Sequence, residues 1–190
     1  MKILEYRYVN TDDVCDMNYN DGFCWSRVYE YPLVINTIKK YRSNFNLMVH
    51  NSSWGFEGVH IKFKNKLESE FVVVISSDIK PSKEANTTVY DITQPPMEGI
   101  KNKFDVVINV STMEEVNDNH VSIFNNLFAQ VAPGGLLICT FDIPGLQIDK
   151  FNEMFGQPIK DIGTRISGNT SRLKNSRYGD LNCGFFIIEK

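Results

Sequence analysis

The sequence lacks the features that mark membrane, secreted and nucleic-acid-binding proteins. No apolar run approaches the roughly 20 residues that span a bilayer. Charged residues interrupt the apolar start at Lys2, Glu5 and Arg7, where a signal peptide would need a continuous core. The net charge is only -3 in 190 residues, so bulk charge gives no attraction to phosphate backbones or anionic lipid. These absences favour a cytoplasmic protein that binds neither a membrane nor a nucleic acid.

Cysteine and histidine are scarce and show no metal-binding pattern. The four cysteines include no C-x-x-C pair, and Cys139 and Cys183 lie in apolar runs, where a thiol behaves as a small hydrophobic side chain. We therefore expect no metal site.

The composition is that of an ordinary globular domain, with 42% hydrophobic and 23% charged residues. Residues 1–26 are polar and aromatic without a sustained period and contain turn-forming sequences, so we expect an N-terminal arm. A chain of this length usually forms one core. The remaining residues 27–190 are therefore predicted to form a single domain.

Apolar runs alternate with segments of helical periodicity along most of this domain. Strands are predicted at 45–49, 71–75, 89–90, 104–110 and 136–141, and helices at 27–41, 56–67 and 124–131. The strands are apolar throughout rather than alternating, which is typical of a parallel sheet covered by helices on both faces.

The C-terminal part departs from this alternation. A short helix is predicted at 148–155, followed by strands at 159–166 and 183–188. The connection between these last strands is too short for a crossover helix, which indicates antiparallel pairing. The sequence thus predicts an α/β fold that is doubly wound, with a mostly parallel seven-stranded sheet, helices on both faces and an antiparallel C-terminal strand.

Polar residues follow the predicted parallel strands, at the sheet edge where open α/β folds bind ligands. His50, Asn51 and Ser52 begin the stretch after the first strand, and Asp78 and Asp91 follow the second and third. We expect these residues to converge on one crevice.

Several motifs carry a family resemblance. They are the segment Ile75-Ser76-Ser77-Asp78, which ends in an acid, the tripeptide Tyr90-Asp91-Ile92, the segment from Phe104 to Val116, and Ala132-Pro133-Gly134-Gly135. From about Tyr31 onward, the chain resembles the class I S-adenosylmethionine-dependent methyltransferases.

The resemblance implies roles for individual residues. Asp78 would hold the ribose hydroxyls of S-adenosylmethionine, and Asp91 would face the adenine amino group with Ile92 beside the ring. Asn109 and Ser111 would line the methionine side. The alternative for both aspartates is a turn-forming role before nearby prolines. The implied activity is methyl transfer to a small-molecule or sugar acceptor.

The first loop departs from the family pattern. The usual acid and closely spaced glycines are replaced by His50, Asn51 and Ser52, and glycine returns only at Gly55. We expect these four residues to meet the cofactor. Trp54 would either fill the cofactor's space or form a pocket wall, and the first case would make the protein a catalytically inactive relative that binds a ligand or partner. A nicotinamide-dependent oxidoreductase is disfavoured because no G-x-G-x-x-G follows the first strand.

Three further groups have two interpretations each. Glu114 or Glu115 could act as a general base, or Glu115 could belong to a capping box that begins at Thr112. His60 and His120 are expected to be surface or satisfied histidines. The basic segment 165–178 could grip an anionic substrate or form a solvated loop.

Overall fold

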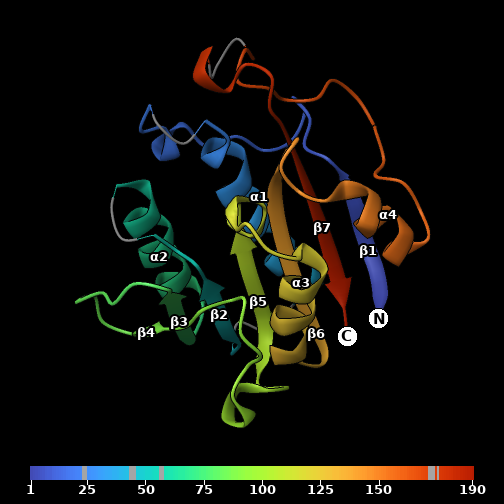
Figure 1. Ribbon diagram of the computed structural model, residues 1–190. Helices are drawn as coiled ribbons and strands as arrows, with labels where there is room; N and C mark the ends of the chain where they lie inside the picture. The colour runs from blue at the N-terminus through green and yellow to red at the C-terminus, as the bar shows by residue number, and fades with distance from the viewer. Residues whose placement is uncertain (23–24, 43–45, 56–57, 171–173, 175) are drawn as a thin grey trace.

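We analysed a computed structural model of the chain, which describes residues 1–22, 25–42, 46–55, 58–170, 174 and 176–190. Its centre is one seven-stranded sheet with the strand order β1-β7-β6-β5-β2-β3-β4 (Figure 1). The strands are β1 (Lys2–Tyr8), β2 (Met48–Ser52), β3 (Val73–Asp78), β4 (Thr87–Val89), β5 (Phe104–Val110), β6 (Val131–Ile143) and β7 (Asn182–Glu189).

The predicted parallel arrangement is confirmed. Strand β2 pairs in parallel with β3 and β5, β3 pairs in parallel with β4, and β5 pairs in parallel with β6. Strand β7 runs antiparallel to β6, from Leu136 opposite Glu189 to Ile143 opposite Asn182. The first predicted strand lies later than expected, at Met48–Ser52, and Phe45 lies outside the described residues.

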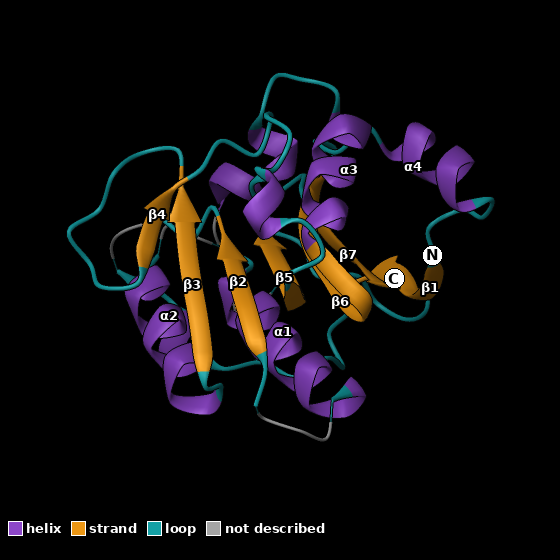
Figure 2. Ribbon diagram, turned by 90° about the horizontal axis from the view of Figure 1, so that it is seen from below, coloured by secondary structure: helices purple, strands orange, loops and turns teal. Residues whose placement is uncertain are grey.

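Helices cover both faces of the sheet, as expected (Figure 2). The α-helices are α1 (Arg27–Tyr41), α2 (Val59–Glu70), α3 (His120–Gln130) and α4 (Ile148–Phe155), and short 3-10 helices are η1 (Met17–Tyr19), η2 (Glu98–Ile100), η3 (Met113–Glu115) and η4 (Ser176–Tyr178). Helices α1 and α2 enclose one apolar core, which includes Val34 and Leu67. Helices α3 and α4 enclose the other, where Phe124, Phe151 and Phe186 pack ring against ring.

One predicted strand is wrong. Residues 159–166 make only isolated bridges, and the edge position beside β7 is taken by β1, which lies within the segment expected to be an arm. Strand β1 buries Tyr6 against α4, where its ring meets Phe155 and its hydroxyl donates to Asn152. Residues 160–165 are all exposed and include Gly163 at a φ of 109°, so this segment has little apolar surface with which to compete for the edge.

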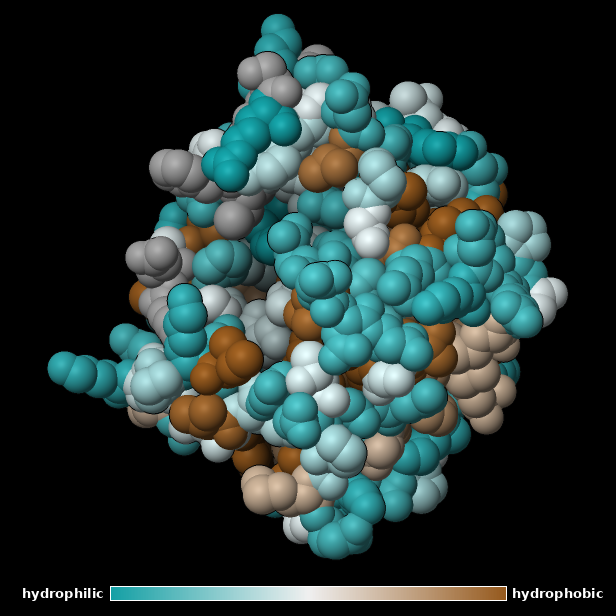
Figure 3. All heavy atoms as spheres, in the orientation of Figure 1, coloured by the Kyte–Doolittle hydropathy of each residue, from teal (hydrophilic) through white to brown (hydrophobic). Residues whose placement is uncertain are grey.

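The surface drawn in Figure 3 is mostly hydrophilic, with smaller hydrophobic patches between the polar side chains. Among the described helices, none has the length and apolar content that crossing a membrane requires.

Candidate functional site

Two adjoining pockets lie at the carboxyl ends of the parallel strands. The outer pocket has a volume of about 500 Å³ and is lined by Ser53, Gly55, His60, Asp78, Ile79, Lys80, Tyr90, Asp91, Ile92, Thr93, Thr112 and Val116. The inner pocket has a volume of about 260 Å³ and is lined by Arg27, Tyr31, Asn51, Ser52, Ser53, Trp54, Gly55, His60, Phe63, Asp78, Val110, Ser111, Thr112 and Glu115. Because five residues line both, the pockets form one crevice at the edge predicted from the sequence.

The crevice brings together seven of the nine residues that the sequence analysis singled out. Gly55 and Asp78 line both pockets, and the Gly55 amide lies 3.4 Å from Asp78 Oδ2. The other five are Asp91 and Ile92 in the outer pocket and Asn51, Ser52 and Ser111 in the inner pocket.

The structure places His50 and Asn109 elsewhere. Strand β2 continues to Ser52, so His50 lies inside the strand, where its ring stacks on Phe104 and Nε2 hydrogen-bonds Ser77 Oγ at 2.7 Å. Burial lowers the pKa of His50 to about 4. Asn109 likewise lies inside β5, where its Oδ1 accepts from the Met113 amide and supports the turn into η3.

The first loop needs glycine at one position. Gly55 has a φ of 65°, and a Cβ on this residue would lie 2.8 Å from Cδ2 of His60. A side chain would therefore be strained by backbone conformation and would displace the His60 ring. The loop thus keeps one glycine that its backbone conformation requires, although it lacks the closely spaced pair.

Asp78 and Asp91 each combine a turn with a place in the outer pocket. Asp78 Oδ1 accepts from the Lys80 amide at 3.1 Å, and Asp91 Oδ1 accepts from the amide and hydroxyl of Thr93 at 2.9 and 2.8 Å. The two interpretations of these aspartates are therefore compatible. Turn hydrogen bonds fix the carboxylates at the pocket wall.

The inner pocket has a bulky wall and a buried polar atom. Trp54 is 4% exposed and lines the inner pocket without reaching the outer one. Ser52 Oγ is buried and has no hydrogen-bond partner within the described part of the chain. A ligand in the pocket could form the hydrogen bond that this hydroxyl lacks.

Three pocket residues were not singled out as site residues from the sequence. His60 is a satisfied histidine, one of the two expected alternatives, because its Nδ1 hydrogen-bonds the hydroxyl of Tyr31, but it was not expected to line both pockets. Tyr31 and Arg27 come from the first helix, which precedes the first parallel strand of the sheet. Only the packing of α1 over the strand ends brings them to the site.

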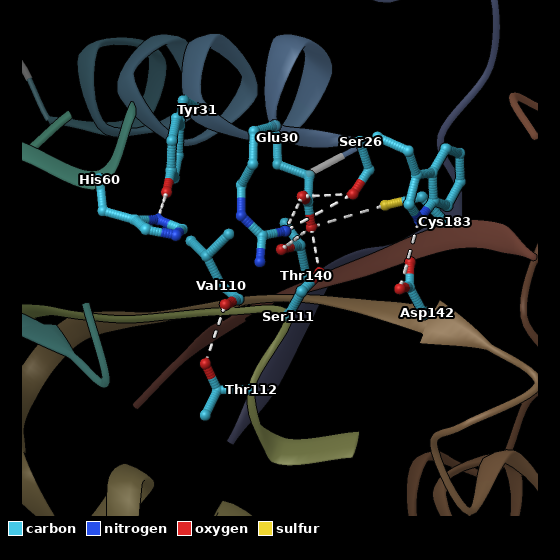
Figure 4. A network of polar contacts seen from close by, with 12 residues as sticks. Ser26, Glu30, Tyr31, His60, Val110, Ser111, Thr112, Thr140, Asp142 and Cys183 are labelled. Atoms are coloured by element: carbon cyan, nitrogen blue, oxygen red, sulfur yellow. Dashed lines mark hydrogen bonds and ion pairs between the residues drawn. The ribbon is translucent and has the colours of Figure 1, made fainter. Parts of the chain in front are cut away.

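A buried carboxylate connects several polar side chains beside the inner pocket (Figure 4). Glu30 is 0% exposed. It accepts hydrogen bonds from Ser26, Ser111 and Thr140 and forms an ion pair with Arg27. Burial alone would raise the pKa of Glu30, but Arg27 and the hydroxyl donors outweigh it and lower the pKa. The charged carboxylate therefore links α1 to the ends of β5 and β6.

Two neighbouring acids behave in the opposite way. Burial raises the pKa of Glu114 to about 8 and that of Asp142 to about 7, and the nearby Glu30 contributes to both shifts. Glu114 Oε1 accepts from the Asp142 amide at 2.7 Å. The capping-box interpretation is wrong, because η3 has no side-chain cap at Thr112, and Glu115 instead lines the inner pocket.

The remaining candidate residues lie outside the crevice. His120 is a satisfied histidine that hydrogen-bonds the Val116 carbonyl and accepts from the Gln147 amide. Arg165 pairs with Asp161 and stacks on Tyr8, and Arg172 lies outside the described residues. Within the described ranges, no group of His, Cys, Asp and Glu side chains could hold a metal ion.

Solved structures share this fold at low sequence identity. A 1,6-didemethyltoxoflavin-N1-methyltransferase from Burkholderia thailandensis, solved with 1,6-didemethyltoxoflavin and S-adenosylhomocysteine, is 9% identical at a TM-score of 0.60, covering 98% of this chain and 99% of that one. The [4+2]-cyclase SpnF is 11% identical at 0.55, with coverage of 98% and 87%. The trans-methyltransferase CalH, in complex with S-adenosylhomocysteine, is 16% identical at 0.54, with coverage of 87% and 57%.

The comparisons establish the fold of the chain. It has the fold of the class I S-adenosylmethionine-dependent methyltransferases. The chain spans between 28% and 57% of the length of three solved structures that it matches. Neither a protein-family model nor a curated protein sequence matches it.

Proposed function

We propose that this protein is an S-adenosylmethionine-dependent methyltransferase that acts on a small-molecule acceptor in the cytoplasm. In this proposal the adenosine part of the cofactor occupies the outer pocket and its methionine end occupies the inner pocket. The observation that carries the proposal is the convergence of Asp78, Asp91 and Ile92 on one pocket at the carboxyl edge of a methyltransferase-like sheet.

The outer pocket fits an adenosine group in size and chemistry. A volume of about 500 Å³ lies within the range of small-molecule sites. The Asp78 carboxylate can accept two hydrogen bonds from a cis-diol, and Asp91 can accept from an exocyclic amino group. Ile92 is 4% exposed and supplies an apolar wall for a base.

The inner pocket fits a zwitterionic amino-acid end despite the altered loop. Arg27 and Glu115 supply one charge of each sign, for a carboxylate and an ammonium group respectively. Ser52 and Asn51 add uncharged hydrogen-bonding groups where the family usually has an acid. The charge lost from the first loop is thus present in the pocket on other elements.

When bound, the cofactor supplies an electrophilic methyl group, and the protein's contribution is to position the acceptor and exclude water. Methyl transfer of this kind requires no metal. The Burkholderia enzyme binds the small molecule 1,6-didemethyltoxoflavin, which supports the same class of acceptor here. A sugar acceptor remains within the proposal.

The alternative is a protein that keeps the fold without the methyl-transfer activity. The cyclase SpnF has the same fold and a different named reaction, so the fold alone does not determine the chemistry. Cofactor binding distinguishes the two proposals.

The test is calorimetric and thermal-shift titration with S-adenosylmethionine and S-adenosylhomocysteine, with NAD as the control ligand. A ligand at 100 times its dissociation constant should stabilise the fold by about 2.7 kcal/mol, whereas NAD should leave the melting temperature unchanged. Absence of binding by both cofactor forms would overturn the methyltransferase proposal and favour the non-catalytic alternative.

A further inference from the structure

A third pocket adjoins the inner pocket on the side away from the outer one. It has a volume of about 90 Å³ and shares Arg27, Ser111 and Glu115 with the inner pocket. Its remaining walls come from Trp25 and Ser26 before α1, Asp142 near the end of β6, and Tyr178 at the end of η4. The three pockets therefore form a continuous series across the ends of the strands.

The position of the third pocket indicates which ligand it would hold if the cofactor binds as proposed above. The inference therefore rests on the proposed function. The adenosine part would lie in the outer pocket and the amino-acid end in the inner pocket. An acceptor would then approach through space that the cofactor leaves free. The third pocket is such a space, because it adjoins the inner pocket and shares no lining residue with the outer pocket.

The walls of the third pocket indicate what it would bind. Two aromatic side chains, Trp25 and Tyr178, line a space that holds roughly three water molecules, enough for the reactive edge of a small planar ring. Asp142 lies among them, with Oδ2 3.4 Å from the indole nitrogen of Trp25 (Figure 4). Its other oxygen, Oδ1, is buried and has no hydrogen-bond partner within the described ranges.

We propose that the third pocket is the acceptor subsite, that it takes the O–H or N–H edge of a small aromatic or heteroaromatic molecule, and that Asp142 accepts the acceptor's proton. The O–H or N–H bond breaks, its proton passes to the Asp142 carboxylate, and its electron pair stays on the acceptor. That pair forms the new bond to the methyl carbon, and the electrons of the broken carbon–sulfur bond stay on sulfur. The proton on Asp142 then leaves to solvent.

The electrostatic surroundings suit Asp142 to this role. The pKa of Asp142 is raised to about 7, chiefly by burial and then by Glu30, so the carboxyl can both take and release a proton near neutral pH. The titratable and charged groups around it are Glu30 and Arg27 on α1, Glu114 and Glu115 on η3, Cys183 on β7, and Tyr178 on η4.

The test uses the indole N–H signal of Trp25 as a reporter inside the third pocket. Nitrogen-15-labelled protein saturated with S-adenosylhomocysteine is titrated at pH 8 with phenol, anisole and methyl glucoside, and the Trp25 and Trp54 signals are followed by NMR. Phenol carries an O–H group, anisole replaces it by a methyl ether, and methyl glucoside represents a sugar. Phenol should shift the Trp25 signal and bind about tenfold more tightly than anisole, because only phenol can donate to an ionised carboxylate.

Two variants connect that preference to Asp142. Asp142→Asn should reduce the preference for phenol to less than threefold, while S-adenosylhomocysteine affinity stays within twofold of the parent. The exposed Asp180→Asn is the matched control and should leave the preference intact. Lowering the pH to 6 should reduce the preference in the parent protein, because Asp142 is then mostly protonated.

A third variant guards against a purely structural effect of the asparagine substitution. Trp25→Phe removes the hydrogen bond that lowers the pKa of Asp142, so the pH midpoint of the phenol preference should move upward. This midpoint is read from saturation transfer to phenol itself. An unchanged midpoint would contradict a role for the Asp142 carboxyl.

The outcomes separate this inference from the proposed function. If the protein does not bind S-adenosylhomocysteine, the proposed function fails. If it does, three results would overturn the acceptor subsite alone. They are no response of Trp25 to phenol, equal affinity for phenol and anisole, and a response to methyl glucoside only.

Discussion

Glu30 shows how a single side chain can join three elements. Its carboxylate lies at the first turn of α1 and accepts from Ser111 after β5 and Thr140 on β6. Its carboxylate also affects its charged neighbours, because it forms an ion pair with Arg27 at the pocket wall and adds to the effect of burial in raising the pKa of Asp142. A residue with no exposed surface thus contributes to the electrostatics around the pockets.

Replacing this carboxylate should be costly. Glu30→Gln keeps the volume but places an amide N–H₂ group among donors and leaves Arg27 without its counter-charge. We expect a loss of about 3 to 5 kcal/mol in the free energy of unfolding, the usual result of breaking a buried ion pair. Urea denaturation measures it.

The matched control is Glu98→Gln, which removes an exposed carboxylate paired with Lys101. That substitution should change the free energy of unfolding by less than about 1 kcal/mol. Equal effects at Glu30 and Glu98 would show that the buried network adds nothing to stability.

Asp78 is expected to act on binding rather than on stability. Asp78→Ala should weaken S-adenosylhomocysteine binding on the order of tenfold to a hundredfold, since each charge-assisted hydrogen bond to a ribose hydroxyl is worth roughly 1.5 to 3 kcal/mol. Calorimetry measures the change. Adenine lacks the ribose, so its affinity should be the same for both proteins. An equal loss for both ligands would refute the assignment of Asp78 to the ribose.

At the scale of elements, β1 protects an edge of the sheet that would otherwise be open. Strand β7 is buried along most of its length, and β1 pairs with it from Lys2 opposite Glu189 to Tyr8 opposite Gly184. Without β1, the unpaired backbone of an apolar strand would face solvent. Strand β1 itself carries Lys2, Glu5 and Arg7, and charged side chains on an edge strand discourage pairing with other molecules.

Tyr6 anchors β1 to the apolar core on the α3 and α4 face. Tyr6→Ala removes a fully buried ring, and we expect a loss of about 3 to 5 kcal/mol in the free energy of unfolding. Tyr6→Phe removes only the hydroxyl that donates to Asn152 and should cost about 1 kcal/mol. A difference below 1 kcal/mol between the two variants, in urea denaturation, would mean that the ring contributes little to packing.

The parallel core of the sheet was predictable because its strands are apolar runs. Strand β5 and helix α4 begin and end at the predicted residues. Strand β1 was not predicted, because Lys2, Glu5 and Arg7 interrupt its apolar residues and its burial depends on β7. The end of β2 was misjudged for a related reason. His50, Asn51 and Ser52 are polar and resemble a loop, yet they are buried between β3 and β5.

The same distinction applies to the site. Asp78 and Asp91 were predictable because each lies at or just after the end of a strand, and sheet topology alone places strand ends together. Arg27 and Tyr31 in the inner pocket and Asp142 in the third pocket were not predictable in this way. They reach these pockets through the packing of α1 over the sheet and through the extension of β6 to Ile143, which local sequence patterns do not encode.

For the whole molecule, the raised pKa values of two buried acids predict a fall in stability between pH 6.5 and 8. Glu114 and Asp142, with folded pKa values of about 8 and 7, bind more protons in the folded than in the unfolded state within this window. Stability therefore falls as the pH rises. The free energy of unfolding should fall by about 2 kcal/mol over this range. Each group can contribute no more than about 1.4 kcal/mol per pH unit. The lowered pKa of His50 affects stability only between about pH 4 and 6.5. There it makes stability rise with pH, which is opposite to the effect of the two acids.

Urea denaturation at several pH values measures this loss. Glu114→Gln should flatten the dependence most, because Glu114 has the larger shift, and Asp142→Asn should flatten it less. Glu98→Gln, at an exposed site, serves as the control and should leave the slope unchanged. Stability that stays constant or rises from pH 6.5 to 8 in the parent protein would contradict the buried state of these acids.

The pairing of β1 with β7 also sets the order in which the sheet can be assembled during synthesis. Strand β1 is synthesised before the other six strands, but its partner β7 is synthesised after them. The parallel strands between them can assemble while β1 has no partner, so the nascent chain carries an unpaired strand until β7 has been made. A chain terminated before β7 would therefore leave both β1 and the neighbouring edge of β6 without a partner strand.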